Sequence, residues 1–260
     1  ILNYYIVISI TFVIFIFLTL KEYKLFKYLF LILGYVLSTN LAFADGHEAA
    51  EVAVADPAEI SFVFNTLLFC IGGFLVMWMA AGFTMLEAGL VRGKNTVVIC
   101  IKNLGLFSIA GLAYYLIGYN LMYAGVDGGY IGSISIWSSG VGSADDLVGQ
   151  GYSPASDWFF QMVFVATTAS IVSGALAERI LIYPFFAFIL VLTAILYPIS
   201  GSWQWGGGWL SEMGFSDFAG STIVHSVGGW AALIGALVLG ARKGKFNEDG
   251  PANAVSYTHL

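Results

Sequence analysis

The chain of 260 residues is 59% hydrophobic and only 10% charged, and its formal net charge is −6. Its mean hydropathy is +0.85, and apolar runs of twenty or more residues recur along it, which excludes an ordinary soluble domain. This composition predicts an α-helical membrane protein, for which the number of spanning helices describes the organisation better than chain length does.

The first 44 residues are typical of a targeting segment rather than of a folded domain. Residues 21–44 combine a lysine-rich start, a short apolar core and a small-x-small ending, Ala-Phe-Ala. We therefore predict a signal peptide that is cleaved before Asp45. Residues 1–20 are apolar and long enough to span a bilayer, but a spanning helix ahead of a signal peptide makes little sense. We interpret them as an upstream or non-native extension, with an extra helix as the alternative.

Hydropathy predicts five spanning helices in the remainder, at residues 61–90, 97–124, 157–178, 180–202 and 219–241. Lysine and arginine occur after the first, third and fifth of these helices and, as Lys102, at the start of the second, whereas the opposite loops contain neither. By the positive-inside tendency, the mature N-terminus lies outside. The sequence thus predicts a multi-pass protein of the cell inner (plasma) membrane.

The loop from Gly125 to Ser156 is long, rich in Gly, Ser and Asp, and without a helical period. We expect an irregular surface loop at this position, since connecting segments of this composition run over the protein surface. Its aromatic residues Trp137 and Tyr152 are of the kind that lie at the membrane interface.

Several reactive or charged side chains lie inside apolar segments, where a structural role is the favoured interpretation. Glu87 ends the first helix within MLEAGLVRGKN, and Glu178 follows the third within SGALAERI, each beside an arginine. We expect both to be buried glutamates bonded to neighbouring helix ends, rather than transport groups. Cys70 and Cys100 are interpreted as small core residues, not as a disulfide pair or metal ligands.

The segment DFAGSTIVH, residues 217–225, opens the last predicted helix with an acid and places a histidine inside it. Asp217 is suited to cap the first turn, because its carboxylate can accept from free N–H groups at the positive helix end. His225 follows eight residues later, which at about 1.5 Å per residue is about 12 Å into the helix. An ionisable group at that depth favours a functional role, and a neutral buried histidine bonded to a neighbouring helix is the alternative.

Four motifs occur together in this order: LEAGLVRGKN, GALAER, WGGGWL and DFAGSTIVH. In order and spacing, residues 60 to about 245 resemble the ammonium transporter family (Amt/Mep/Rh), and the first and third motifs are similar to the Amt branch. The resemblance implies an all-α fold, a polytopic membrane helix bundle that forms the first five-helix half of an eleven-helix inverted-repeat transporter. The domain would cover residues 45–252, and residues 253–260 would be an atypical tail at the end of a fragment.

The resemblance also implies a pathway for ammonium. Phe160 and Trp205 correspond to the family's outer aromatic site, Phe164 to its gate, Asp217 to the acid near that site and His225 to the first of two pore histidines. In this hypothesis NH4+ is bound by the aromatic rings, loses its proton near Phe164 and passes as NH3 along an apolar pore past His225. The second histidine has no counterpart in this chain, so we expect no complete pore from it alone.

The family further implies a homotrimer and a cytoplasmic signal-transduction regulator of the full-length protein, with methylammonium as an open second substrate. We expect no enzyme activity, no cofactor, no metal and no nucleic-acid partner. An ammonium sensor with the same membrane domain is the alternative function. A membrane-embedded enzyme that uses Asp217 and His225 is disfavoured, because no activated nucleophile and no metal-ligand spacing accompany them.

Overall fold

The computed structural model describes residues 56–138, 143–246 and 252–253. Contacts divide the chain into two units, Ile1–Ala55 and Asp56–Leu260, and all the described residues belong to the second. The signal peptide at 21–44, the extension at 1–20 and nearly all of the tail at 253–260 lie outside the described residues and stay predictions.

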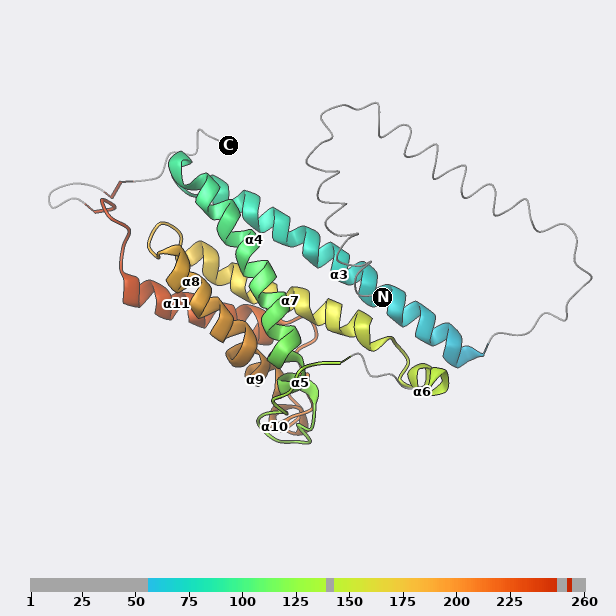
Figure 1. Ribbon diagram of the computed structural model, residues 1–260. Helices are drawn as coiled ribbons and strands as arrows, with labels where there is room; N and C mark the ends of the chain where they lie inside the picture. The colour runs from blue at the N-terminus through green and yellow to red at the C-terminus, as the bar shows by residue number, and fades with distance from the viewer. Residues whose placement is uncertain (1–55, 139–142, 247–251, 254–260) are drawn as a thin grey trace, which may run out of the picture. The chain divides into compact units, whose positions relative to one another are not determined.

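Five helical segments of the described chain are long and apolar enough to cross a membrane, as the sequence predicts. Their bounds differ from the predicted ones by at most four residues. The first helix begins at Pro57, because the Asp56 side chain accepts a hydrogen bond from the N–H of Ala58 and proline suits the first helical position. The elements in chain order (Figure 1) are α3 (Pro57–Gly89), η1 (Gly93–Asn95), α4 (Thr96–Ala113), η2 (Tyr114–Gly118), α5 (Tyr119–Tyr123), α6 (Ala144–Gly149), α7 (Pro154–Ala175), α8 (Ile182–Val191), η3 (Leu192–Leu196), α9 (Tyr197–Ser202), α10 (Trp209–Glu212), η4 (Ser221–Ser226) and α11 (Val227–Leu239).

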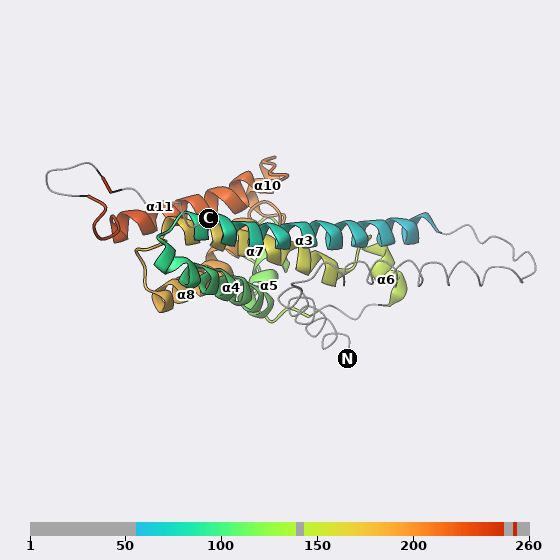
Figure 2. The same ribbon diagram turned by 90° about the horizontal axis from the view of Figure 1, so that it is seen from above.

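Helix α7 is the centre of the bundle. Of an apolar 18-residue stretch of each span, 56% is buried in α7 but only 6% in α3 and 17% in the last span. Helices α3, α4 and α11 all pack against α7, and Figures 1 and 2 both draw α3 alongside it. Small buried residues on α7, such as Ala166, Ala169 and Ser173, let these neighbours approach closely, as is typical of helices packed in membranes.

Three of the spans contain a turn of π-helix, which hydropathy did not predict. Segment η3 directly precedes α9, whose second residue is Pro198. Proline has no N–H to donate and its ring collides with the carbonyl four residues earlier, so a wider turn ahead of it relieves the conflict. Segment η2 packs against η3 at Gly118, where an added Cβ would lie 3.1 Å from the Thr193 carbonyl oxygen.

The last span begins at Ser221, not near Asp217, so the predicted depth of His225 was counted from the wrong residue. His225 is only four positions after Ser221, the first residue of the helix. Gly220 has a φ of +83°, a left-handed conformation that glycine adopts without strain and that separates the preceding loop from the helix. The His225 N–H then bonds to the Gly220 carbonyl oxygen at 3.0 Å, which closes the first π turn.

The loop between α5 and α7 is more ordered than expected. It contains the short helix α6, whose start is a capping box: Ser143 and Asp146 each accept from the other's backbone N–H. Trp137 is buried, with its ring stacked on Trp158 at 5.4 Å, so this side chain packs inside the protein, and its interface position stays a prediction. Cys100 is exposed, which also contradicts its assignment to the core.

Glu178 joins three helix ends, as the sequence predicts for a structural glutamate. Its carboxylate accepts from the backbone N–H of Arg92 at 3.0 Å and from the Arg92 side chain at 2.9 Å, and Arg242 lies 3.6 Å away. Asn95 donates to the same carboxylate. Burial pushes the pKa of the Glu178 carboxyl upward, but these hydrogen bonds and the Arg92 charge outweigh burial and lower the pKa. The ends of α3, α7 and α11 therefore meet at one charged cluster.

Glu87 is also buried and structural, but its partners are not an arginine. It accepts from Asn103 at 3.0 Å and from Ser173 at 2.7 Å, and Lys102 lies 3.8 Å away. The Lys102 ammonium donates to the Ser173 carbonyl oxygen at 2.7 Å and lies 5.0 Å from the Phe185 ring centre. Lys102 is thus a buried bundle residue, and it does not belong with the loop charges that predicted the orientation.

Candidate cation pathway

Three of the predicted site residues form a continuous row of aromatic rings. Phe160 and Phe164 lie one turn apart on α7 with ring centres 5.1 Å apart in an edge-to-face arrangement, and Phe164 lies 6.5 Å from Trp205. The Phe160 ring fits against Gly72 of α3, where an added Cβ would lie 2.7 Å from a ring carbon. The negative ring faces of such a row are suited to attract a cation.

Trp205 is held in place by the glycines that follow it and by the loop ahead of the last helix. Its indole N–H donates to the Asp217 backbone carbonyl oxygen at 2.6 Å. A Cβ at Gly206 would lie 2.0 Å from the Met122 carbonyl oxygen, and Gly207 has a φ of +74°. The positions after Trp205 therefore require glycine, because the backbone there passes directly over α5 and then adopts a left-handed conformation.

The Asp217 carboxylate is buried and accepts four backbone N–H groups. One oxygen accepts from Gly220 and Ser221 at 2.8 and 3.0 Å, and the other from Thr222 and Ile223 at 2.8 and 2.9 Å. Burial raises the pKa of this carboxyl, but the four hydrogen bonds outweigh burial and keep the pKa below its ordinary value. Asp217 thus caps the last helix, as predicted, and remains ionised at neutral pH.

The charge of Asp217 is stabilised by N–H dipoles rather than by a cation. Among the residues that the structure describes, the ion pairs all involve Glu87 or Glu178. Hydrogen bonds lower the pKa of a carboxylate without cancelling its charge. The negative charge beside Trp205 is therefore available to act on a cation that approaches the aromatic row.

His225 lies on an exposed face of the first helical turn, and its ring nitrogen Nδ1 is 3.1 Å from the Gly220 carbonyl oxygen. If Nδ1 carries the proton, it donates to this carbonyl and leaves Nε2 as the acceptor. The turn is anchored on α7 because Thr168 donates to the Val224 carbonyl oxygen at 3.2 Å. In the described part of the chain, His225 is linked to the aromatic row through the Asp217 cap, not through a ring contact.

Sequence reasoning missed two groups near the row. Phe69 stacks on Phe160, and the Tyr119 hydroxyl donates to the Asp157 carboxylate at 2.5 Å. Asp157 is an acid in the first turn of an apolar helix, and this signal could have attracted attention to it. Nothing in the local pattern distinguishes Phe69 from the other apolar residues of α3.

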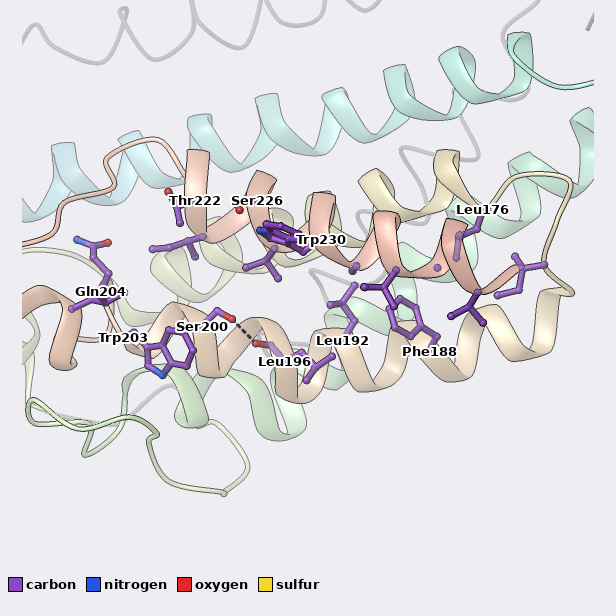
Figure 3. A pocket seen from close by; sticks show the side chains of 18 of the residues that line it. Leu176, Phe188, Leu192, Leu196, Ser200, Trp203, Gln204, Thr222, Ser226 and Trp230 are labelled. Carbon is purple, nitrogen blue, oxygen red and sulfur yellow. Dashed lines mark hydrogen bonds between the residues drawn. The ribbon is translucent and has the colours of Figure 1, made fainter. Parts of the chain in front are cut away.

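An apolar groove of about 740 Å³ lies between α8–α9 and the last span. Figure 3 shows Thr222, Ser226 and Trp230 on one side of it, facing Ser200 and Leu196 on the other. None of the five predicted site residues lines this groove. The described residues also hold no group of three His, Cys, Asp or Glu side chains placed to bind a metal ion.

The fold and the site together define a polytopic helical membrane protein in which an aromatic row leads to a buried carboxylate and a histidine. The family model described as the Ammonium Transporter Family matches residues 67–260, and the chain belongs to this family. The all-α architecture expected from the motifs is confirmed, and membership in a family of transporters agrees with the prediction that the chain is not an enzyme.

Individual relatives agree with this assignment. The chain is 44% identical to a putative ammonium transporter of Synechocystis over 86% of its own length and 50% of the relative, and 41% identical to the ammonium transporter Amt2 of Archaeoglobus fulgidus over 79% and 44%. A solved structure called Sensor Amt Protein superimposes with a TM-score of 0.70 at 36% identity, over 77% of this chain and 50% of that one. The chain thus spans about half the length of the relatives it matches.

Proposed function

We propose that this chain forms one half of an ammonium-conducting pathway. NH4+ is bound by the aromatic rings of Phe160 and Trp205, loses its proton near the gate ring of Phe164 and continues as NH3 past His225. The single observation that carries the proposal is the aromatic row that ends at the ionised, cation-free Asp217. A cation gains from ring faces and a fixed negative charge most where water is scarce.

The position of Phe164, the proposed gate, suits the conversion of NH4+ to NH3. Phe164 contacts both Phe160 and Trp205 edge-to-face, so a cation that moves on beyond these three rings leaves the negative ring faces behind. An apolar passage disfavours a bare cation and favours the neutral molecule. His225 offers a ring nitrogen that can hydrogen-bond to ammonia or carry a proton, because an imidazole has one nitrogen that accepts and one that donates.

The rest of the proposal follows the family resemblance. A partner half of the bundle supplies the second pore histidine, three subunits associate, and a cytoplasmic regulator binds the full-length protein. The charged cluster at Glu178 lies on the cytoplasmic side of the inner membrane, and the signal peptide at 21–44 is removed so that the mature N-terminus lies outside. Methylammonium, which differs from NH4+ by one methyl group, is a second substrate.

The test measures methylammonium uptake by the full product of the gene, with Trp205→Leu and Trp203→Leu as a matched pair. Trp203 lies two residues earlier, and its indole N–H donates to the Tyr130 carbonyl oxygen, away from the aromatic row. We expect Trp205→Leu to raise the KM about tenfold, since a desolvated cation–π contact is worth about 1–2 kcal/mol. Trp203→Leu should leave the KM unchanged. Equal KM values for Trp205→Leu and the unsubstituted protein would refute the proposal.

His225→Ala tests the later step. We expect the ammonium-evoked current to fall at least tenfold while binding at the aromatic row persists, because the ring contacts that the structure describes for Phe160, Phe164 and Trp205 do not involve the His225 side chain. A current that stays at its original level would remove His225 from the proton step.

An ammonium sensor is the second candidate, and the likeness to the Sensor Amt Protein favours it. A sensor would need the same aromatic binding row but not a high flux. A signalling domain encoded downstream in the same gene, together with ammonium binding without uptake, would select the sensor over the transporter.

A further inference from the structure

Two additional rings extend the aromatic row beyond Phe160. Phe69 of α3 stacks on Phe160 with ring centres 5.1 Å apart and planes inclined by 21°. Tyr152, in the loop ahead of α7, meets Phe69 edge-to-face at 5.1 Å. The rings of Tyr152, Phe69, Phe160, Phe164 and Trp205 therefore form one unbroken series, which draws on α3, α7 and two loops.

The position of Tyr152 is fixed by hydrogen bonds on both of its sides. The Asn65 side-chain amide donates to the Gly151 carbonyl oxygen at 2.9 Å, and the Thr66 hydroxyl accepts from the Ser153 N–H at 2.9 Å. Asn65 and Thr66 belong to one turn of α3, one turn before Phe69. These two polar residues of an apolar helix hold the loop so that the Tyr152 ring stays beside Phe69.

A buried acid acts electrostatically on this end of the series. Asp157 is 8% exposed and accepts from the Tyr119 hydroxyl. Burial raises the pKa of the Tyr152 phenol, and the charge of Asp157 raises it further. The phenol therefore stays neutral, and its ring lies within the electrostatic reach of the Asp157 carboxylate. Ring faces and a neighbouring negative charge together are suited to attract a small organic or inorganic ammonium cation.

We propose that Tyr152, Phe69 and Asp157 form an entry subsite for the ammonium cation, outside the Phe160–Trp205 site. The inference rests on the proposed function, because it extends the same row of rings outward. A cation bound at Tyr152 reaches Phe160 across the single intervening ring of Phe69. The subsite raises the local concentration of cation at the pathway and takes no part in the proton step.

The test measures the concentration dependence of methylammonium uptake in the full gene product, with Tyr152→Leu, Tyr152→Phe and Tyr130→Leu compared. Tyr130 is an exposed tyrosine of the neighbouring loop whose ring packs on Trp209, so it serves as the matched control. We expect Tyr152→Leu to raise the KM about fivefold with little change in the maximal rate, because one cation–π contact is lost. Tyr152→Phe keeps the ring and should stay within about twofold of the original KM.

Two further variants keep the test decisive if Tyr152→Leu lowers the amount of folded protein. Asp157→Asn has nearly the same shape and keeps an oxygen for Tyr119; it should raise the KM, most strongly at low ionic strength where charge attraction is least screened. Asn65→Leu releases the loop at Gly151 and should raise the KM in the same direction as Tyr152→Leu. A maximal rate that falls without a change in KM would identify these residues as merely structural and overturn the inference.

The Trp205→Leu variant separates the two proposals. If Trp205→Leu raises the KM and Tyr152→Leu does not, the entry subsite is refuted and the proposed function stands. If neither raises the KM, the proposed function itself fails.

Discussion

The two ends of the helix bundle each contain a carboxylate of lowered pKa, but they stabilise it in opposite ways. Glu178 is surrounded by the side chains of Arg92, Asn95 and Arg242. Asp217 is surrounded by four backbone N–H groups. Cations neutralise a carboxylate, whereas N–H dipoles hold it ionised and leave its charge in place. The first arrangement suits a joint between helix ends, and the second suits a site that attracts a cation.

Acidification should have the largest effect on stability, because it protonates the Asp217 and Glu178 carboxylates together. The folded-state pKa values of Asp217 and Glu178 are lowered, so below about pH 4, where unfolded carboxyls protonate, the unfolded state binds more protons. The stability that the two groups contribute is fully present above that pH and is lost as the pH falls further. Thermal unfolding in mild detergent, followed from pH 7 to pH 3, should show a steep drop in Tm below pH 4. A Tm that stays level over this range would contradict the assignment of the two carboxylates.

Asp217→Ala should be the most damaging single substitution of the comparison. It leaves four N–H groups at a partly buried helix start without their acceptor, those of Gly220 and Ile223 being on buried residues. We expect a loss of about 3 kcal/mol in the free energy of unfolding, since each buried unpaired group costs about 1–3 kcal/mol. Chemical denaturation in detergent measures it. Asp146→Ala, which removes an exposed capping carboxylate from α6, is the control and should cost little. Similar losses for the two variants would show that the Asp217 cap is unimportant.

Glu178→Ala should cost less, about 2 kcal/mol, because one of its partners is well exposed. The Arg92 side chain is 38% exposed, so part of the ion-pair energy is already screened by water. Glu59→Ala, in the exposed first turn of α3, is the matched control. Added salt should weaken the Glu178 cluster more than the Asp217 cap, since mobile ions screen exposed charges but not buried N–H contacts. If added salt changed the stability losses of Glu178→Ala and Asp217→Ala by the same amount, the distinction between the two ends would be contradicted.

The smallest expected effect concerns the packing that joins the two ends. Gly228 of α11 faces α7, and an added Cβ would lie 3.0 Å from both the Thr168 carbonyl oxygen and a carbon of Ile171, whereas Gly229 has open space. Gly228→Ala should therefore cost about 1 kcal/mol through overpacking, and Gly229→Ala should be neutral. Denaturant unfolding of the two variants checks the difference. Equal stabilities would mean that α11 does not rest on α7 at Gly228.

The predicted residues differ in how far local pattern could locate them. The i, i+4 spacing of Phe160 and Phe164 places both rings on one face of a helix, and the structure confirms their contact. The packing of the Phe160 ring against Gly72 could not be predicted, because the two residues are 88 positions apart and no local pattern relates them. Glu87 was expected to be buried and bonded to neighbouring helix ends, but its partners Lys102, Asn103 and Ser173 could not be named, because they are set by how α3 crosses α4 and α7.

By itself the sequence determined the class of the protein, the five spans, the structural role of Glu178 and the placement of Phe160 and Phe164 on one helix face. These follow from hydropathy, charge placement and local motifs, which act over one or two helical turns. Only the tertiary structure decided the three π turns, the start of the last helix at Ser221 and the continuation of the aromatic row to Phe69 and Tyr152. Each of these depends on groups that are distant in the chain or on a backbone hydrogen bond that competes with the helix, and helical periodicity records neither.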